Sequence, residues 1–386
     1  SREAHKKYDA AQLLNAENKI VMPGLINTHT HSAMTVFRGF ADDLPLYEWL
    51  NEYVFPAEGK FTSPEMVYKG TRLALAEMLL SGTTCFNDMY YHQDTAAQAA
   101  EEFGMRAVLT ESMADFAVPG SKNFRQALDF TEKMYKKFRD NPLISIGAAV
   151  HAPYTANPDL LVAAKELSDK YRLLMNIHVS ETARESKTIK ERYGETSVHL
   201  LDDLGFLNGR TVAAHSVHVS EEEIQIYKNR GVGVAHNPEC NMKIASGAAP
   251  VPRFLQEGIK VGLGTDGTAS NNNLDLFEEM RSMAFLHKLT TGDPTVLSAR
   301  TCVRIATMGG AKVIGKADKT GSLEIGKKAD IITLDINSPH AVPLYDPYST
   351  VVYSLNGSSV CDTLINGRIL MQDRKIPGID LNKIMH

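Results

Sequence analysis

The sequence predicts an α/β protein: a (β/α)8 TIM-type barrel with a small accessory β-sandwich built from both termini. Eight short stretches rich in Val, Ile, Leu, Ala and Thr recur before residue 266, and segments of helical composition separate them. Alternating strands and helices indicate parallel pairing through βαβ crossovers. Eight such units fit a closed barrel of about 250 residues or more, and a doubly wound open sheet is the alternative.

The expected barrel strands are apolar runs, which is typical of strands covered on both faces. They span residues 20–28, 83–90, 106–113, 143–150, 173–179, 211–217, 231–236 and 259–265. Helices are expected between them, because several segments open at Ser, Asn or Pro and end at Gly. The clearest span residues 63–82, 157–172, 220–231 and 251–258.

The composition changes at about residue 320, which predicts a second unit. The stretches GSLEIGKKADIITLD (321–335), STVVYSLNG (349–357) and VCDTLINGRILMQD (360–373) are typical of short alternating strands with Asn-Gly turns. A weak strand, AAQLLNAENK (10–19), is expected to join them. The predicted domains are therefore residues 1–22 with 320–386 for the accessory unit, and 23–319 for the barrel.

Composition narrows the class of partner. The 386 residues are 43% hydrophobic and 23% charged, as in ordinary globular proteins. A net charge of -5 offers no basic surface for nucleic acid or anionic lipid, which favours a small-molecule substrate and leaves a homo-oligomer open. No apolar run approaches the roughly 20 residues of a membrane helix, and no signal peptide opens the sequence. We therefore expect a cytoplasmic protein, whose four scattered cysteines are reduced and buried.

Two histidines lie two residues apart where the first expected strand ends, in PGLINTHTHSAM (residues 23–34). Side chains at positions i and i+2 of a strand point to the same face, so His29 and His31 point together. Active sites of barrels assemble at that end of the strands. Such a pair suits a zinc-type ion, and a pair of ordinary hydrogen-bonded histidines is the alternative.

Further ionisable side chains occupy the same end of other strands. Six of the eight strands end in His or Asp, namely at His29 and His31, His151, His178, His215, His236 and Asp266. Because the carboxyl ends of the strands meet at one rim of a barrel, we expect these side chains to gather there. His199 and His218 are interpreted as structural or surface residues, and His236 is equally compatible with a packing role.

The motifs PGLINTHTH, HVSE, AAHSVH, AHNP and GTDG, in this order, resemble those of the amidohydrolase superfamily, specifically its mononuclear-metal deaminases. The resemblance covers nearly the whole chain, and GSLEIGKKADIITLD resembles the accessory β-sandwich of that family. It implies that His29, His31, His178 and Asp266 bind one divalent metal ion per subunit and leave a position for water. Zn²⁺ is the expected ion, with Fe²⁺ and Mn²⁺ as alternatives. The strand LISIGAAVHAP (143–153) carries no lysine that would bridge a second metal.

The implied mechanism is attack by water. A divalent ion can lower the pKa of a bound water from about 15.7 to about 7. Asp266 would accept a proton from that water, His215 would orient it, and Glu181 would protonate a ring nitrogen before ammonia leaves. The H-x-E and P-C-x-x-C signature of the separate zinc deaminase fold is absent, because Cys240 in NPECNM has no such partner. As alternatives, Glu181 is a solvated residue of a helical first turn and Asp266 a turn residue.

Within the superfamily the closest resemblance is to 5'-methylthioadenosine/S-adenosylhomocysteine deaminases. It is carried by HTHSAMTVFRGFADDLPLYEWL, VFPAEGKF, FNDMYYH, VHAPY and TDGTASNNNLDLFEEM. By position, it implies that Glu58 binds the ribose hydroxyls, that His151 contacts the substrate, and that Ser270 and Trp49 line the pocket. The alternative interpretations are that Glu58 is a surface residue and that Trp49 packs in the core.

One position departs from the resembled pattern. In MRAVLTESMAD (105–115) the family has a substrate-contacting arginine where this chain has Glu111, and Arg106 lies too early on the strand to replace it. If that arginine meets the carboxylate of S-adenosylhomocysteine, this chain should bind that nucleoside poorly, unless Lys122 or Arg125 compensates.

The expected function is hydrolytic deamination of an adenine nucleoside: 5'-methylthioadenosine, S-adenosylhomocysteine or adenosine. The alternative within enzymes is an amidohydrolase acting on another amino- or chloro-substituted ring, such as guanine, cytosine, a pterin or an s-triazine. A non-catalytic barrel used in assembly or regulation would be expected to lack metal ligands, yet all four positions and Glu181 are present.

Overall fold

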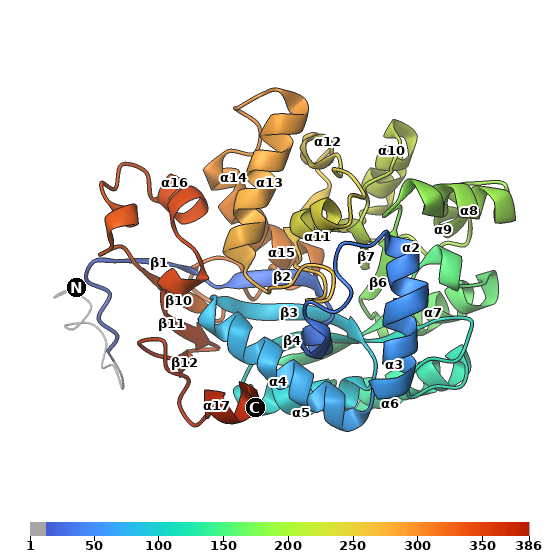
Figure 1. Cartoon of the computed structure of the whole chain (residues 1–386), viewed down its shortest axis with the longest axis horizontal. Coiled ribbons are helices and arrows are strands. Elements are labelled where there is room, and N and C mark those ends of the chain that lie inside the picture. The colour runs from blue at the N-terminus through green and yellow to red at the C-terminus, as the bar shows by residue number, and fades with distance from the viewer. Residues whose placement is uncertain (1–12, 386) are drawn as a thin grey trace.

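The computed structural model describes residues 13–385, and eight parallel strands form its centre (Figure 1). They pair in chain order and are β2 (Leu25–Thr30), β3 (Thr83–Tyr90), β4 (Arg106–Met113), β5 (Ile144–Val150), β6 (Met175–Val179), β7 (Thr211–His215), β8 (Gly233–His236) and β9 (Lys260–Leu263). The first strand, β2, and the last, β9, lie side by side. Thr28 Oγ1 of β2 donates to the carbonyl of Leu263 on β9 at 2.8 Å. The strands therefore close into the predicted barrel, and the open-sheet alternative is wrong.

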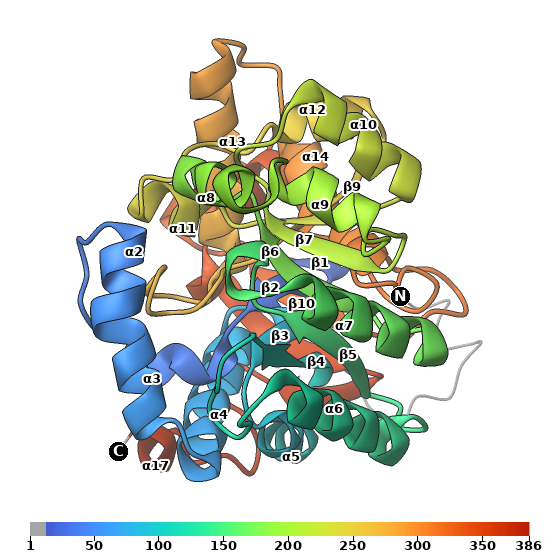
Figure 2. The ribbon, with the colours of Figure 1, turned by 90° about the vertical axis from the view of Figure 1, so that its right-hand side faces the viewer.

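Helices follow the strands and cover the outside of the barrel (Figure 2). Those of the βα units are α4 (Pro64–Leu80), α5 (Gln93–Phe103), α6 (Phe124–Phe138), α7 (Pro158–Tyr171), α8 (Ala183–Tyr193), α9 (Ser197–Asp203), α10 (Glu221–Arg230), α11 (Pro238–Lys243), α12 (Val251–Gln256), α13 (Leu276–Thr291), α14 (Ala299–Arg304) and α15 (Gly310–Val313). Three of the four clearest predicted helices are capped as the sequence predicts, because the side chains of Ser63, Asn157 and Ser220 each accept a first-turn N–H.

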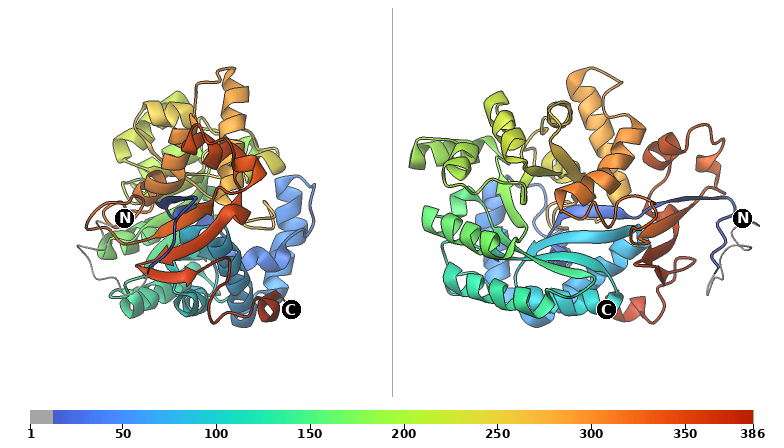
Figure 3. Two further views of the ribbon diagram at one scale, coloured as in Figure 1. Left: turned by 90° about the vertical axis from the view of Figure 1, so that its left-hand side faces the viewer. Right: turned by 180° about the vertical axis from the view of Figure 1, so that it is seen from behind.

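A helical insertion lies between β2 and α4, where the chain leaves the first barrel strand. It contains the turn η1 (Ser32–Phe37) and then a nearly continuous run of α2 (Leu46–Glu48), η2 (Trp49–Val54) and α3 (Phe55–Phe61). This run stands at the opposite end of the molecule from the N-terminal strand (Figures 1 and 3). It carries side chains over the carboxyl ends of the barrel strands, where the candidate site lies.

The accessory unit is a four-stranded antiparallel sheet formed by both ends of the chain (Figure 3). Its strands, in spatial order, are β1 (Lys19–Pro23), β10 (Ile331–Asp335), β11 (Val360–Ile365) and β12 (Arg368–Met371). Asn366 and Gly367 both have positive φ in the β11–β12 turn, as a tight hairpin requires. The predicted fold class is thus confirmed, while the residue limits of the two domains remain a prediction.

A buried ion pair ties this sheet to the base of the barrel. Arg106, at the start of β4, donates to Asp330 through Nε at 2.7 Å and Nη2 at 3.0 Å. The main-chain N–H of Asn366 donates to the same carboxylate at 2.7 Å. Arg106 is therefore committed to the junction of the two units.

The predicted strand over residues 20–28 is wrong in extent, because it is two strands of different sheets. Lys19–Pro23 pairs with β10, and only Leu25–Thr30 belongs to the barrel. Pro23 has no N–H for a continuing ladder. A Cβ at Gly24 would come within 2.1 Å of the Thr84 side chain, so the chain passes between the sheets at a residue without one.

Two further strand predictions are corrected. In the weak strand expected over residues 10–19, residues 13–18 form no strand and residues 10–12 lie outside the described part. Most of the stretch 349–357 is helical and none of it is a strand, with α16 (Pro347–Ser349) continuing into η6 (Thr350–Ser354). Asp346 accepts the N–H of Tyr348 and starts that helix, whose adjacent buried Val351 and Val352 pack beside α13 and α14. A short helix ends the described chain at α17 (Leu381–Met385).

Among the described residues, no helix combines the length and apolar character needed to cross a bilayer. Cys85, Cys240 and Cys302 are buried free thiols, as expected. Cys361 is only partly buried, which corrects the expectation for that residue, because it lies on β11 of the accessory sheet.

Candidate metal centre and active site

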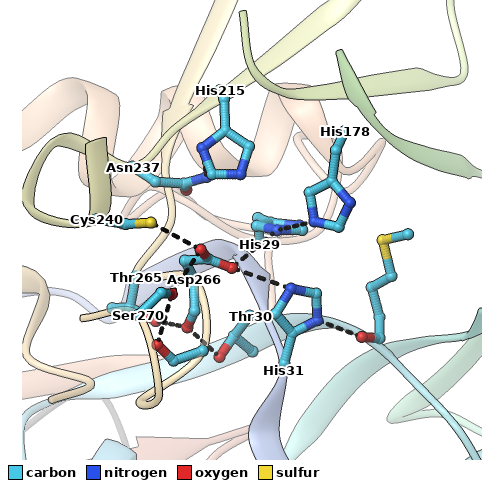
Figure 4. Close-up of polar contacts among 12 residues, drawn as sticks. His29, Thr30, His31, His178, His215, Asn237, Cys240, Thr265, Asp266 and Ser270 are labelled. Atoms are coloured by element: carbon cyan, nitrogen blue, oxygen red, sulfur yellow. Dashed lines mark hydrogen bonds and ion pairs between the residues drawn. The ribbon is translucent and has the colours of Figure 1, made fainter. Parts of the chain in front are cut away.

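Four side chains predicted to share a metal ion converge at the carboxyl end of the barrel (Figure 4). His29 and His31 come from the end of β2, His178 from β6, and Asp266 from the segment after β9. One ligand atom of each lies within 4.8 Å of the others. The Oδ1 atom of Asp266 is 3.0 Å from His31 Nε2 and 3.3 Å from His29 Nε2.

The backbone at Asp266 adopts a conformation that is uncommon for residues other than glycine. Its φ is +60°, in the left-handed region, and His215 at the end of β7 has φ +69°. Hydrogen bonds to β2 hold the first of these turns: the Asp266 N–H donates to the carbonyl of His29 at 3.0 Å, and Thr30 Oγ1 donates to the Asp266 carbonyl at 2.9 Å. Backbone strain of this kind clusters at functional sites.

Main-chain carbonyls fix two of the imidazole rings. His31 Nδ1 hydrogen-bonds to the carbonyl of Met89, and His178 Nδ1 hydrogen-bonds to the carbonyl of His151 at 2.7 Å. A carbonyl only accepts, so each Nδ1 carries a proton, and Nε2 is the nitrogen that each ring turns toward the cluster. Metal-binding histidines are usually oriented by such a bond on the other ring nitrogen.

The cluster fits a divalent metal ion. Burial lowers the pKa of His29 to about 4 and the pKa of His178 well below its ordinary value, which keeps both rings neutral at pH 7. Their Nε2 atoms are only 3.1 Å apart, and the buried Asp266 Oδ1 has no hydrogen-bond partner. Three imidazoles and one carboxylate are a donor set that binds Zn²⁺ and related ions. The group of His29, His31, His178 and Asp266 is therefore a metal site.

Hydrogen bonds also fix the second oxygen of the Asp266 carboxylate. Its Oδ2 accepts from Ser270 Oγ at 2.8 Å and from Cys240 Sγ at 2.9 Å (Figure 4). These two donors turn Oδ1 toward the imidazoles. Ser270 was expected only to line the pocket, and sequence reasoning missed Cys240, which comes from helix α11 after β8.

Two candidate proton-transfer groups face each other beside this cluster. Glu181 follows β6, and its Oε1 lies 3.8 Å from Nε2 of His215. The Nδ1 of His215 is hydrogen-bonded to Asn241 Oδ1 at 2.8 Å, which orients the ring toward Glu181. Burial raises the pKa of Glu181, so its protonated form persists to higher pH than that of an exposed carboxyl. Glu181 is buried, and the interpretation as a solvated helix residue is wrong.

A cavity opens beside the metal site, with about 620 Å³ of empty space between its walls and the adjoining solvent. Its aromatic wall consists of Trp49, Phe55, Tyr90, Tyr91 and Tyr154. Among the described residues that line it, none is Lys or Arg. The cavity is therefore suited to a planar, largely uncharged molecule with a few polar groups.

The predicted substrate-binding residues all line this cavity. Glu58, from α3, is buried, and burial raises its pKa to about 7 despite the hydroxyl of Tyr90. The His151 ring lies against His178 with centroids 5.0 Å apart, and burial lowers its pKa to about 3. Glu58 is not a surface residue. Trp49 is both buried and part of the cavity wall, so the core and pocket interpretations hold together.

Glu111 does not face the cavity. Its carboxylate points to the start of α5 and accepts the main-chain N–H groups of His92 at 3.3 Å and Gln93 at 3.0 Å. Lys122 and Arg125 are exposed and are not part of the cavity wall. Neither of them replaces the missing arginine in this structure.

The remaining predicted histidines lie outside the cavity. His236 is buried at the end of β8, where its Nε2 is 3.1 Å from Nε2 of His287 on α13. His218 is exposed and His199 half-buried, in agreement with their interpretation as structural or surface residues. The packing role is thus the one that the geometry supports for His236.

Comparisons with known proteins agree on one family. The model of the amidohydrolase family matches residues 20–370. The chain is 46% identical over 378 residues to a 5-methylthioadenosine/S-adenosylhomocysteine deaminase of Syntrophobacter fumaroxidans, covering 98% of this chain and 86% of that one. It is 45% identical over 381 residues to a 5'-deoxyadenosine deaminase of Methanosarcina mazei, covering 98% and 87%.

A solved structure extends the likeness to three dimensions. It is an adenosine deaminase from Xanthomonas campestris with bound zinc, which superposes with a TM-score of 0.98 at 37% identity over 100% of this chain and 88% of that one. The family model and the relatives both cover the barrel strands that carry the four-residue metal site. The chain belongs to the amidohydrolase family.

Proposed function

We propose that this protein hydrolyses the exocyclic amino group of adenine nucleosides, with Glu181 and His215 as proton-transfer groups beside a single metal ion. The observation that carries the proposal is the position of Glu181, buried and 3.8 Å from His215 at the edge of a cavity that also contains the metal site. Curated relatives named as deaminases of 5'-substituted or 5'-deoxy adenosines support the choice of ring.

Zn²⁺ is the ion we propose, one per subunit, because three imidazoles and a carboxylate suit it and a related solved structure holds zinc. Fe²⁺ and Mn²⁺ accept the same donors, and metal analysis of the purified protein distinguishes them. Once bound, the ion supplies Lewis acidity that makes water a nucleophile at neutral pH.

The side chains of this protein then move the protons. The Asp266 carboxylate accepts one proton from the attacking water, and His215 Nε2 holds that water toward the ring. Glu181 donates a proton to the ring nitrogen next to the amino-bearing carbon. A C–O bond forms, Asp266 passes its proton to the amino group, and the C–N bond breaks, so ammonia leaves with one of the two protons of water. The other proton stays on the new hydroxyl group. Glu181 takes a proton back when the ring returns to its keto form.

Glu58 and the aromatic wall of the cavity determine which nucleosides can bind. A carboxylate accepts two hydrogen bonds from a ribose diol, and a buried carboxylate left without those donors is costly. With no Lys or Arg in the described cavity wall, a charged amino-acid tail at the 5' position finds no counter-ion there. We therefore propose 5'-methylthioadenosine, 5'-deoxyadenosine or adenosine as better substrates than S-adenosylhomocysteine.

Ammonia release from a panel of purified compounds tests this function. The panel contains 5'-methylthioadenosine, 5'-deoxyadenosine, adenosine, S-adenosylhomocysteine, guanine, cytosine, a pterin and an aminated s-triazine. We expect the highest kcat/KM with an adenine nucleoside that has an uncharged 5' group. A higher kcat/KM for guanine, cytosine, the pterin or the triazine would contradict the proposed adenine specificity and support the alternative substrate class.

A further inference from the structure

A second group of potential metal ligands lies directly beside the first. Glu181 follows β6, His215 ends β7 and Cys240 lies on α11, and all three are buried. One ligand atom of each lies within 4.8 Å of the others. None of them belongs to the group of three imidazoles and one carboxylate described above.

The imidazole of His215 and the carboxylate of Glu181 in this second group already face each other. Asn241 Oδ1 accepts a hydrogen bond from His215 Nδ1 at 2.8 Å, which leaves Nε2 directed at Glu181. Asp266 connects the two groups: its Oδ1 faces His31 at 3.0 Å and its Oδ2 faces Cys240 Sγ at 2.9 Å. A carboxylate in this position can share its two oxygens between two cations.

The donor atoms select a class of cation. One sulfur, one imidazole nitrogen and carboxylate oxygens suit zinc and softer ions, whereas Mg²⁺ and Ca²⁺ require oxygen ligands throughout. The group of His29, His31, His178 and Asp266 has no sulfur donor, so a soft, thiophilic ion should bind the second group with a metal–sulfur bond that the first group cannot form.

We propose that Cys240, His215 and Glu181, with Oδ2 of Asp266 as a shared ligand, form a second site for a thiophilic divalent cation such as Zn²⁺ or Cd²⁺. Binding forms bonds from the cation to sulfur, nitrogen and oxygen and breaks the S–H bond of Cys240, whose proton passes to solvent. An ion in this site occupies the lone pairs of Glu181 and His215. Excess cation therefore inhibits turnover, a consequence that rests on the proposed function, whereas the binding itself does not.

Cadmium titration of the purified protein with its first site filled tests the binding without any substrate. A Cd²⁺–thiolate bond gives an ultraviolet charge-transfer band that imidazole and carboxylate ligands do not give. We expect one further equivalent of Cd²⁺ to bind the wild-type chain with this band. Binding without the band, or no further binding, would overturn the second site on the wild-type protein alone.

Two cysteine variants assign the band. Cys240→Ser retains a hydroxyl that can donate to Asp266, and we expect it to lose the band and to bind the second equivalent at least about tenfold more weakly. Cys361→Ser removes the partly exposed thiol of β11 and should leave the band unchanged. A band that survives in Cys240→Ser, or that disappears in Cys361→Ser, would contradict the assignment.

Inhibition is then measured as the fraction of each variant's own uninhibited rate. Half-inhibition by Cd²⁺ should require at least about tenfold more cation in Cys240→Ser than in the wild-type or Cys361→Ser chain. Equal sensitivity of all three would contradict an inhibitory role. If no adenine nucleoside is turned over, the spectroscopic and stoichiometric results still decide the site, so failure of the proposed function is distinguishable.

Discussion

Glu181 and His215 face each other at the edge of the cavity, with Oε1 of one 3.8 Å from Nε2 of the other. They reach this place from the ends of β6 and β7, two neighbouring strands of the barrel. Glu181 is not one of the four members of the metal site. Its chemistry is therefore separable from metal binding.

Glu181→Gln should abolish turnover while leaving the metal in place. An amide of the same shape cannot donate a carboxyl proton to the ring, so we expect kcat to fall about 10²- to 10⁴-fold. Metal content, measured by elemental analysis of the same sample, should match that of the wild-type protein. Glu191→Gln, on the exposed side of α8, is the matched control. Full activity in Glu181→Gln would remove this residue from the mechanism.

His178→Ala should lose the metal. The ring supplies one of four donors and lies 3.1 Å from His29 Nε2. Because a bound ion stabilises only the folded state, a chelator should lower the Tm of the wild-type protein and have little effect on the variant. His218→Ala, at an exposed position, should retain both the metal and the response to chelator. Equal metal content in the two variants would contradict the proposed ligand set.

Glu58 should make nucleoside binding depend on pH. Burial raises its pKa to about 7, and only the ionised carboxylate accepts from both ribose hydroxyls. Binding of a ribose substrate should therefore weaken as the pH falls below about 7. The measurement is the ratio of kcat/KM for a nucleoside to that for its 2',3'-dideoxy analogue, since groups that act on the ring cancel in this ratio.

The matched variants for this effect lie on the same helical insertion. Glu58→Gln should lower the ratio about 10- to 100-fold and make it independent of pH, because a charged hydrogen-bond acceptor has been lost. Glu52→Gln, at an exposed position, should behave as the wild-type protein. A wild-type ratio that stays constant from pH 5 to 8 would exclude Glu58 as the ribose ligand.

Most of the barrel was predictable because its physical signal is local. Strands β3 and β4 match the predicted limits, since each is a buried apolar run that ends at a helix signal. The first strand was not resolved into two, because residues 20–26 form one nearly unbroken apolar run that crosses from the accessory sheet into the barrel. The helix over 347–354 was predicted as a strand for the same reason: its two adjacent valines suit either structure.

The metal site was predictable from the residues because it follows the strand ends, whereas Glu58, Trp49 and Ser270 were predicted only through the family resemblance. The histidines at the ends of β2, β6 and β7 can be recognised as site residues from their positions in the sequence, because each follows an apolar run that predicts a strand. Cys240 cannot, because it comes from a helix and its role depends on the distance to Asp266. The orientation of Glu111 follows from the alternation of side chains along a strand. Thr110 hydrogen-bonds inside the barrel and Ser112 lines the cavity, so the residue between them points to the opposite face.

Glu111 should therefore matter to stability and not to substrate binding. Its carboxyl caps the start of α5, and burial raises its pKa to about 8. The folded protein then keeps a proton that the unfolded chain releases above its ordinary pKa of 4.5. This group's contribution to the free energy of unfolding must fall as the pH rises from about 4.5 to 8.

Glu111→Gln removes that titration. Urea unfolding at several pH values should show a smaller loss of stability with rising pH than in the wild-type protein, while KM for the nucleoside stays unchanged. Glu166→Gln, on the exposed face of α7, should keep the wild-type slope. A changed KM in Glu111→Gln with an unchanged slope would restore a substrate-binding role to this position.

The ion pair of Arg106 and Asp330 should contribute to stability at the end of the barrel away from the site. Arg106 begins β4, whereas the metal site lies at the carboxyl ends of the strands. Arg106→Met leaves the buried Asp330 carboxylate without its cation, which costs about 3–5 kcal/mol. Lys69→Met breaks an exposed pair with Glu65, which water and salt screen, and should leave the stability nearly unchanged. Urea unfolding measures both, and kcat at a temperature where both variants are folded should be unchanged, because neither side chain reaches the cavity. Equal losses of stability in the two variants would show that the buried pair does not hold the accessory sheet to the barrel.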